Sequence, residues 1–176
     1  MAILEIKKYP DPILRKKCEE ITEITPEIKE LALNMGESMI KDKGIGLSAP
    51  QVGESKRIII VHLIEERSPE EKEKKVPQVF INPKIIKKSK ETAIEEEGCL
   101  SFPDLFLEIK RAKEVEVETL NLNGEKIKIE AKGLPARILQ HEIDHLDGIL
   151  FIDRLNFFQK LLFRIRPNKQ KHGIDR

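Results

Sequence analysis

The stretch Gln140-His141-Glu142-Ile143-Asp144-His145-Leu146 is the segment around which the rest of this chain is organised. Two histidines four residues apart lie on one face of an α-helix, so both imidazoles can bind one metal ion. The glutamate beside the first histidine then lies next to that ion, where it can take a proton from an attacking water. Metal-dependent hydrolases use this arrangement, and the alternative is a charged helix face that carries two histidines.

A catalytic metal site of this kind needs a third protein ligand and one open position for water. Candidates downstream of the helix are poor, since His172 lies in a basic tail and Asp153 follows an apolar run. Cys99 is a better candidate, because it lies in a polar loop and a thiolate binds divalent transition metals well. A plain buried thiol is the alternative at Cys99, whereas Cys18 is only a core or surface cysteine.

Length and composition indicate a single domain, and its near-zero net charge gives no sign of a polyanionic binding partner. The 176 residues suffice for a real core, and 32 basic against 31 acidic residues give a net charge of +1. This balance argues against a general nucleic-acid binder, so we expect no DNA partner. No apolar run could span a bilayer and no signal peptide is visible, so we expect a cytoplasmic protein without membrane contact. We expect a single catalytic domain over residues 1–166 and a basic C-terminal tail over residues 167–176.

Apolar periodicity predicts three helices and several short strands. The helices lie within residues 25–43, 133–148 and 156–167, after an N-terminal arm that Tyr9-Pro10-Asp11-Pro12 keeps out of regular structure. Asn123-Gly124 marks the turn of the clearest hairpin. Strand-like segments occupy residues 57–63, 79–81, 85–86, 92–94, 115–119, 127–129 and, as a strand or extended exit, 149–152, with Asn82-Pro83 as a break and 65–75 as a solvated loop. The pattern predicts an α+β fold, with antiparallel sheets packed around a central metal-binding helix and an N-terminal and a C-terminal helix.

Small residues fill the segment from Gly44 to Gly53, between the first helix and a buried strand. Glycines at 44 and 46 permit close approach of another backbone, which suits one wall of a site. A nucleotide-binding loop would run from a strand into a helix, whereas this segment runs from a helix into a strand. We therefore assign it to a site wall.

Three separated pieces, residues 44–51, 97–101 and 140–146, resemble the three signature motifs of the peptide deformylases in order and in spacing. One departure is Ser48, where family members commonly carry alanine. The resemblance covers essentially the whole chain and implies that Cys99, His141 and His145 bind one divalent metal ion. Ferrous iron is the ion it implies, with zinc, nickel or cobalt as alternatives in a purified sample.

The resemblance also implies an activity in protein biosynthesis, the removal of formate from N-formylmethionyl nascent peptides. Glu142 would be the general base, while the Gln51 amide and the Leu100 backbone N–H would stabilise the oxyanion. Glu97 and Arg111 resemble a pair that braces the cysteine loop. The residues expected to bind the peptide or wall the methionine pocket are Ile45, Gly46, Gly98, Leu134, Arg137 and Ile138.

Other functions share part of this pattern. A metalloendopeptidase would use the same helix motif to cleave internal amide bonds. A ribosome-associated module could hold the metal as a structural clamp, although such sites normally have four protein ligands. A blue-copper electron carrier also uses two histidines and a cysteine, but gives Glu142 no role. Basic residues near the C-terminus, Arg164 and Lys169 among them, suggest a weak ribosome contact, with a plain solvated tail as the alternative.

Overall fold

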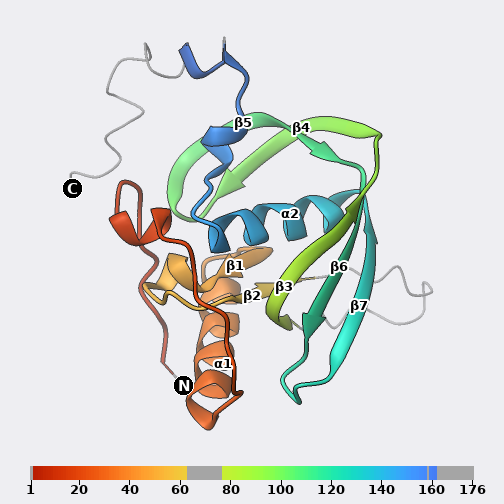
Figure 1. The fold of residues 1–176 in the computed structure, drawn as a ribbon. Coiled ribbons are helices and arrows are strands. Elements are labelled where there is room, and N and C mark those ends of the chain that lie inside the picture. The colour runs from red at the N-terminus through yellow and green to blue at the C-terminus, as the bar shows by residue number, and fades with distance from the viewer. Residues whose placement is uncertain (1, 63–76, 158, 162–176) are drawn as a thin grey trace, which may run out of the picture.

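The structure, a computed structural model, describes residues 2–62, 77–157 and 159–161 (Figure 1). The predicted loop at 65–75, the basic tail at 167–176 and most of the predicted C-terminal helix lie outside the described residues. The start of that helix is described, and the Asn156 side chain accepts a hydrogen bond from the Gln159 N–H at 2.9 Å, as expected of a helix cap. In chain order the described elements are α1 (Pro26–Lys41), β1 (Gly46–Ser48), β2 (Ile58–Val61), β3 (Gln78–Lys88), β4 (Thr92–Cys99), β5 (Phe102–Ala112), β6 (Glu114–Leu120), β7 (Lys126–Lys132) and α2 (Leu134–Leu146).

Two antiparallel sheets enclose α2. One sheet has five strands in the order β1-β2-β3-β6-β7, and the other is the β4–β5 pair. Figure 1 shows α2 between the β4–β5 pair above and β1 and β2 below, with β3, β6 and β7 curving around its far end. The predicted α+β fold around a central helix is confirmed. Within the described residues, no helix has both the length and the apolar character needed to cross a bilayer.

Strand β2 is apolar at every position because both of its faces are buried. Ile58 and Ile60 join the core cluster that contains the buried face of α1, whereas Ile59 and Val61 join the cluster that contains α2. Successive side chains of a strand point to opposite faces, so a helix on each face leaves no position for a polar residue. This packing makes α2 a core helix, buried from Ala136 to its C-terminal end.

The predicted break at Asn82-Pro83 is wrong. Strand β3 continues through this dipeptide, and a register shift between Ile81 and Lys84 absorbs it as a bulge against β6. Asn82 adopts a positive φ of 51°, and its side chain bonds both the N–H and the carbonyl of Ile21, at 2.9 and 2.8 Å. The side-chain amide of Asn82 thereby ties β3 to the N-terminal arm, as a neighbouring strand would.

Two further segments differ from expectation. No element was predicted for residues 102–112, which form β5, an 11-residue strand with Pro103 and the positive-φ Asp104 near its start. Residues 151–154 form a 3-10 turn and not a strand, because the Asp153 carboxylate accepts a hydrogen bond from the Leu150 N–H and tightens the chain.

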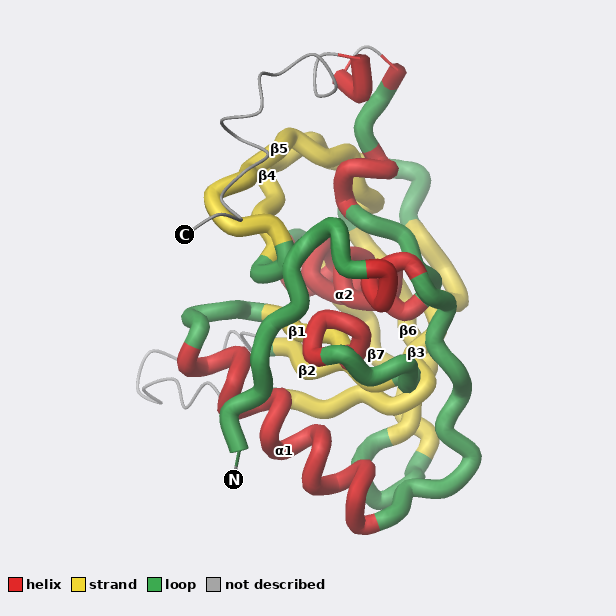
Figure 2. Tube along the Cα trace, turned by 90° about the vertical axis from the view of Figure 1, so that its left-hand side faces the viewer, coloured by secondary structure: helices red, strands yellow, loops and turns green. Residues whose placement is uncertain are grey.

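The N-terminal arm crosses the molecule from α1 to α2, as the green tube in Figure 2 shows. Three of its backbone N–H groups donate hydrogen bonds to the three motif segments, one to each segment. Lys7 donates to Gln51 at 2.7 Å, Tyr9 to Ser101 at 2.9 Å and Cys18 to Leu146 at 2.8 Å. The arm thus links the glycine-rich segment, the cysteine loop and the end of α2.

Replacing Asn82 with alanine should destabilise the fold by about 2 kcal/mol, since two partly buried backbone groups of Ile21 lose their partner and alanine is strained at positive φ. Urea unfolding of the purified variant measures this loss. The exposed Asn123→Ala is a matched control and should stay within about 0.5 kcal/mol of the parent. Equal stability of the two variants would contradict the role given to Asn82.

Candidate metal centre

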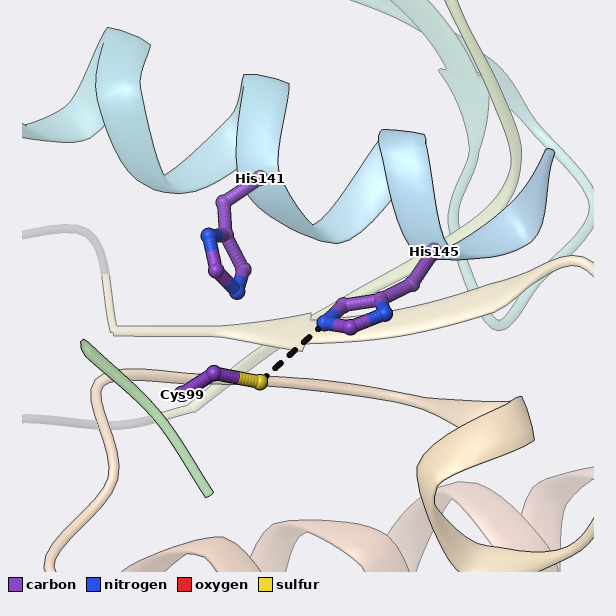
Figure 3. A group of neighbouring side chains, drawn as sticks. All are labelled: Cys99, His141 and His145. Atoms are coloured by element: carbon purple, nitrogen blue, oxygen red, sulfur yellow. Dashed lines mark hydrogen bonds between the residues drawn. The ribbon is translucent and has the colours of Figure 1, made fainter. Parts of the chain in front are cut away.

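Cys99, His141 and His145 meet in the interior although two separate elements carry them. The histidines project from successive turns of α2, and Cys99 is the last residue of β4 (Figure 3). One ligand atom from each residue lies within 4.8 Å of the others, and Cys99 Sγ is 3.4 Å from His145 Nε2. Ligand atoms of a tetrahedral site with these donors are about 3.4–3.6 Å apart. The cluster therefore fits a divalent transition metal.

The two imidazoles differ in their electrostatic surroundings. Burial lowers the pKa of His145 well below its usual value, which keeps it neutral, as a ligand must be. Burial also acts to lower the pKa of His141, but the cysteine and the Glu97 carboxylate outweigh it and raise that pKa well above the usual value. The space between the three side chains thus favours a positive charge.

Glu97 fixes the orientation of the first histidine. His141 Nδ1 donates to Glu97 Oε2 at 3.0 Å, which leaves Nε2 to face the cluster. Burial acts to raise the pKa of Glu97, but hydrogen bonds from His141 and Arg111 lower it to about 2. Arg111 contacts both oxygens of Glu97, at 2.9 and 3.1 Å. The carboxylate is therefore ionised and held from two sides.

Asp144 faces the same buried network from α2. It accepts from Arg111 Nη1 at 2.5 Å and from Arg154 Nε at 3.0 Å. Arg137, predicted to line the methionine pocket, borders the cavity, but its guanidinium bonds Glu95, Glu97 and backbone carbonyls of β4 and β5. Arg154 was not predicted to have a role, because its partner Asp144 lies on another element.

Glu142 lies beside the ligands without a partner for one oxygen. Its Oε2 is buried and accepts no hydrogen bond within the described part of the chain. Burial raises the pKa of Glu142 to about 7, and the charge on His141 offsets only part of that effect. A Cβ at Gly46 would lie 2.4 Å from Glu142 Oε1, so only glycine lets β1 approach this closely. The carboxylate is thus confined against the cluster.

The Gln51 amide is oriented by its own segment. Its Oε1 accepts from both the N–H and the hydroxyl of Ser48, each at 2.8 Å, and its Nε2 lies 3.4 Å from Cys99 Sγ and 3.3 Å from Ser101 Oγ. The hydroxyl of Ser48 therefore helps to turn the NH₂ group of Gln51 toward the metal cluster. Leu100 follows in the turn between β4 and β5.

A cavity of about 610 Å³ opens onto this cluster between β1 and β4. Gln51, Cys99, Leu100, His141 and Glu142 all border it. So do the residues predicted to contact the peptide, namely Ile45, Gly46, Gly98, Leu134, Arg137 and Ile138. Phe102 and Phe106 form an aromatic part of the wall that was not predicted, because β5 itself was not predicted.

Cys18 is a core thiol. Burial raises its pKa to about 11, so it stays protonated, and its side chain belongs to the cluster packed against α2. Among the described residues, Cys18 does not belong to any group of side chains that could hold a metal.

Comparison with known proteins agrees with the motifs. The family described as polypeptide deformylase matches residues 3–160. A peptide deformylase of Thermodesulfovibrio yellowstonii is 51% identical over 171 residues, covering 97% of this chain and 100% of that protein. The crystal structure of a peptide deformylase from Ehrlichia chaffeensis matches with a TM-score of 0.81 at 39% identity and covers 92% of each chain. One from Thermotoga maritima matches with a TM-score of 0.80 at 38% identity, covering 89% of this chain and 99% of that chain.

The matched residues 3–160 contain all three motif segments, and the structural match covers 92% of this chain. The chain therefore belongs to the peptide deformylase family and is a hydrolase.

Proposed function

We propose that the protein hydrolyses the formyl group from the N-terminal formylmethionine of newly made polypeptides and releases formate, in the cytoplasm where those chains emerge. The observation that carries the proposal is the buried Oε2 of Glu142, which has no partner in the described residues and lies beside the three-residue cluster. A buried acceptor of this kind needs a hydrogen-bond donor. The attacking water of the reaction supplies it.

Cys99, His141 and His145 would hold the metal, and we take ferrous iron as the ion. A divalent ion held there would lower the pKa of a water towards about 7 and would polarise the formyl carbonyl. The ligand set suits such an ion, because thiolate and imidazole are donors that divalent transition metals prefer.

Glu142 moves the proton in the reaction. Its carboxylate takes a proton from the water whose oxygen attacks the formyl carbon, and it then gives that proton to the leaving amine as the C–N bond breaks. A general base works best when its pKa is near the working pH, and burial has already raised the pKa of Glu142 in that direction. The products are formate and a free N-terminal methionine.

Gln51 and Leu100 would stabilise the negative charge that develops on the formyl oxygen. The Gln51 Nε2 already faces the cluster, because Ser48 holds the other end of the amide. The backbone N–H of Leu100 is the second donor. Donors aimed at a developing oxyanion are worth about 3 kcal/mol each when they are preorganised.

The peptide would lie between two strand edges. In the part of the chain that the structure describes, β1 is the edge of the five-stranded sheet and β4 pairs only with β5. An extended substrate can therefore pair with backbone groups near Gly46 on one side and Gly98 on the other. The methionine side chain would fill the apolar part of the cavity near Leu134 and Ile138.

A metalloendopeptidase is the second candidate, since it would share the metal and Glu142. A structural clamp fits less well, because the group found in the described residues has three members and not four. Anaerobic purification, with metal analysis and formate release from a formylmethionyl peptide measured on the same sample, decides among them. Stoichiometric iron with formate release supports the proposal, whereas cleavage of internal bonds without formate would reject it.

Glu142→Gln should keep the metal and lose at least about a hundredfold in kcat, because an amide of the same shape cannot accept the proton. Metal content and formate release are measured on the same preparation. An active Gln variant would remove Glu142 from the mechanism.

Cys99→Ser should weaken binding of every metal, since a neutral hydroxyl is a poorer ligand than a thiolate. Cys18→Ser is the matched control and should leave metal content unchanged, because that thiol lies in the core away from the cluster. Metal retained per protein after dialysis measures both. The reverse pattern would show that the ligand assignment is wrong.

A further inference from the structure

Arg154 lies in the 3-10 turn that follows α2, at residues 151–154. Its guanidinium grips the Asp144 carboxylate with two nitrogens, Nε to Oδ2 at 3.0 Å and Nη2 to Oδ1 at 2.5 Å. The Asp144 side chain is 10% exposed, whereas that of Arg154 is 38% exposed. This pair therefore runs from the surface into the buried network behind the metal cluster.

The network continues without a gap to a proposed metal ligand. Arg111 Nη1 donates to Asp144 at 2.5 Å, and the Nε and Nη2 of the same arginine donate to Glu97 at 2.9 and 3.1 Å. Glu97 in turn accepts from His141 Nδ1 at 3.0 Å. Each link in this chain is an ionic hydrogen bond, the strong kind.

Charge balance explains why the outermost member matters. Glu97 and Asp144 are two buried carboxylates that share Arg111, and Glu97 has a second buried cation in Arg137. Arg154 is the second cation on Asp144, and without it the whole charge of that carboxylate falls on Arg111. The guanidinium of Arg111 would then move toward Asp144 and release part of its hold on Glu97, since an unpaired buried charge is costly.

We propose that Arg154 is a positioning residue for the metal centre, which holds Asp144 so that Arg111 and Glu97 fix the His141 imidazole. The proposal rests on the proposed ligand set. Groups that orient a ligand typically change metal affinity by about 10- to 100-fold when removed. Arg154 acts through three intervening residues, so we expect a smaller effect, about 3- to 10-fold faster metal release.

The alternative role for Arg154 is only to fasten the 3-10 turn to the helix. A second arginine offers the control for that role. Arg15 binds both oxygens of Asp153 in the same turn, and the exposures of this pair are 41% and 37%. Removing Arg15 loosens the same segment but leaves Asp144 and its partners untouched.

The experiment follows release of cobalt(II) from the cobalt-loaded protein into excess chelator. Arg154→Met should release cobalt about 3- to 10-fold faster than the parent and shift the visible absorption of the bound cobalt. Arg15→Met should match the parent in both. Arg154→Lys keeps the positive charge but loses the two-nitrogen contact of the guanidinium, so its cobalt release rate should lie between those of the parent and the Met variant. If the Met variant does not fold, the Lys variant serves as the test in its place.

Arg154→Met and Arg15→Met with the same release rate, or an Arg154→Met indistinguishable from the parent, would overturn the proposal. A double-mutant cycle gives a second test. Arg154→Met should accelerate cobalt release less when Asp144→Asn is already present, because the partner of Arg154 has then been changed. An effect of the same size in both backgrounds would also overturn it. Failure of the ligand set itself is distinguishable, because His141→Ala would then retain its cobalt.

Discussion

The burial of α2 on every side is the constraint on which the rest of the structure depends. A helix enclosed by two sheets normally carries apolar residues, yet this one carries two histidines, two carboxylates, a glutamine and an arginine. A buried polar group is tolerated only when it is hydrogen-bonded or coordinated. The surroundings satisfy this demand group by group, as when the Gln140 side chain pairs with both the N–H and the carbonyl of Ala112. Within the described residues, the exceptions on α2 are Glu142 Oε2 and His145 Nδ1, and both belong to side chains of the candidate metal centre.

The arginine and carboxylate network behind the cluster contributes geometry more than stability. Buried ion pairs lose most of their Coulombic gain to desolvation. Their value is that each carboxylate has one low-energy position, which limits how far the His141 ring can turn. Glycine at 46 then lets β1 approach the Glu142 carboxylate more closely than a residue with a Cβ could.

Local signals predicted α1, α2, the β6–β7 hairpin and the fold class, whereas the family resemblance was needed to choose Cys99 as the third member of the group that could hold a metal. Periodicity and caps mark these elements directly. Strand β5 escaped prediction because Pro103 and Asp104 precede a run without clear alternation. The bulge at Asn82 escaped because its amide pairs with Ile21, a residue 61 positions away. Arg154 escaped for the same reason, since its importance comes from a partner on another element. Hydrogen bonds between residues far apart in the chain cannot be predicted from the spacing of residues along the sequence.

The N-terminal arm has a consequence for how the protein comes into being. Its three backbone bonds join residues that are 44, 92 and 128 positions apart, and all of these partners are made later than the arm. Long-range contacts are slow to form, because the intervening chain must first be ordered. The bond from Cys18 therefore cannot form before the end of α2 has left the ribosome. A truncated chain that stops short of that helix lacks this bond together with His141 and His145, two members of the group that could hold a metal.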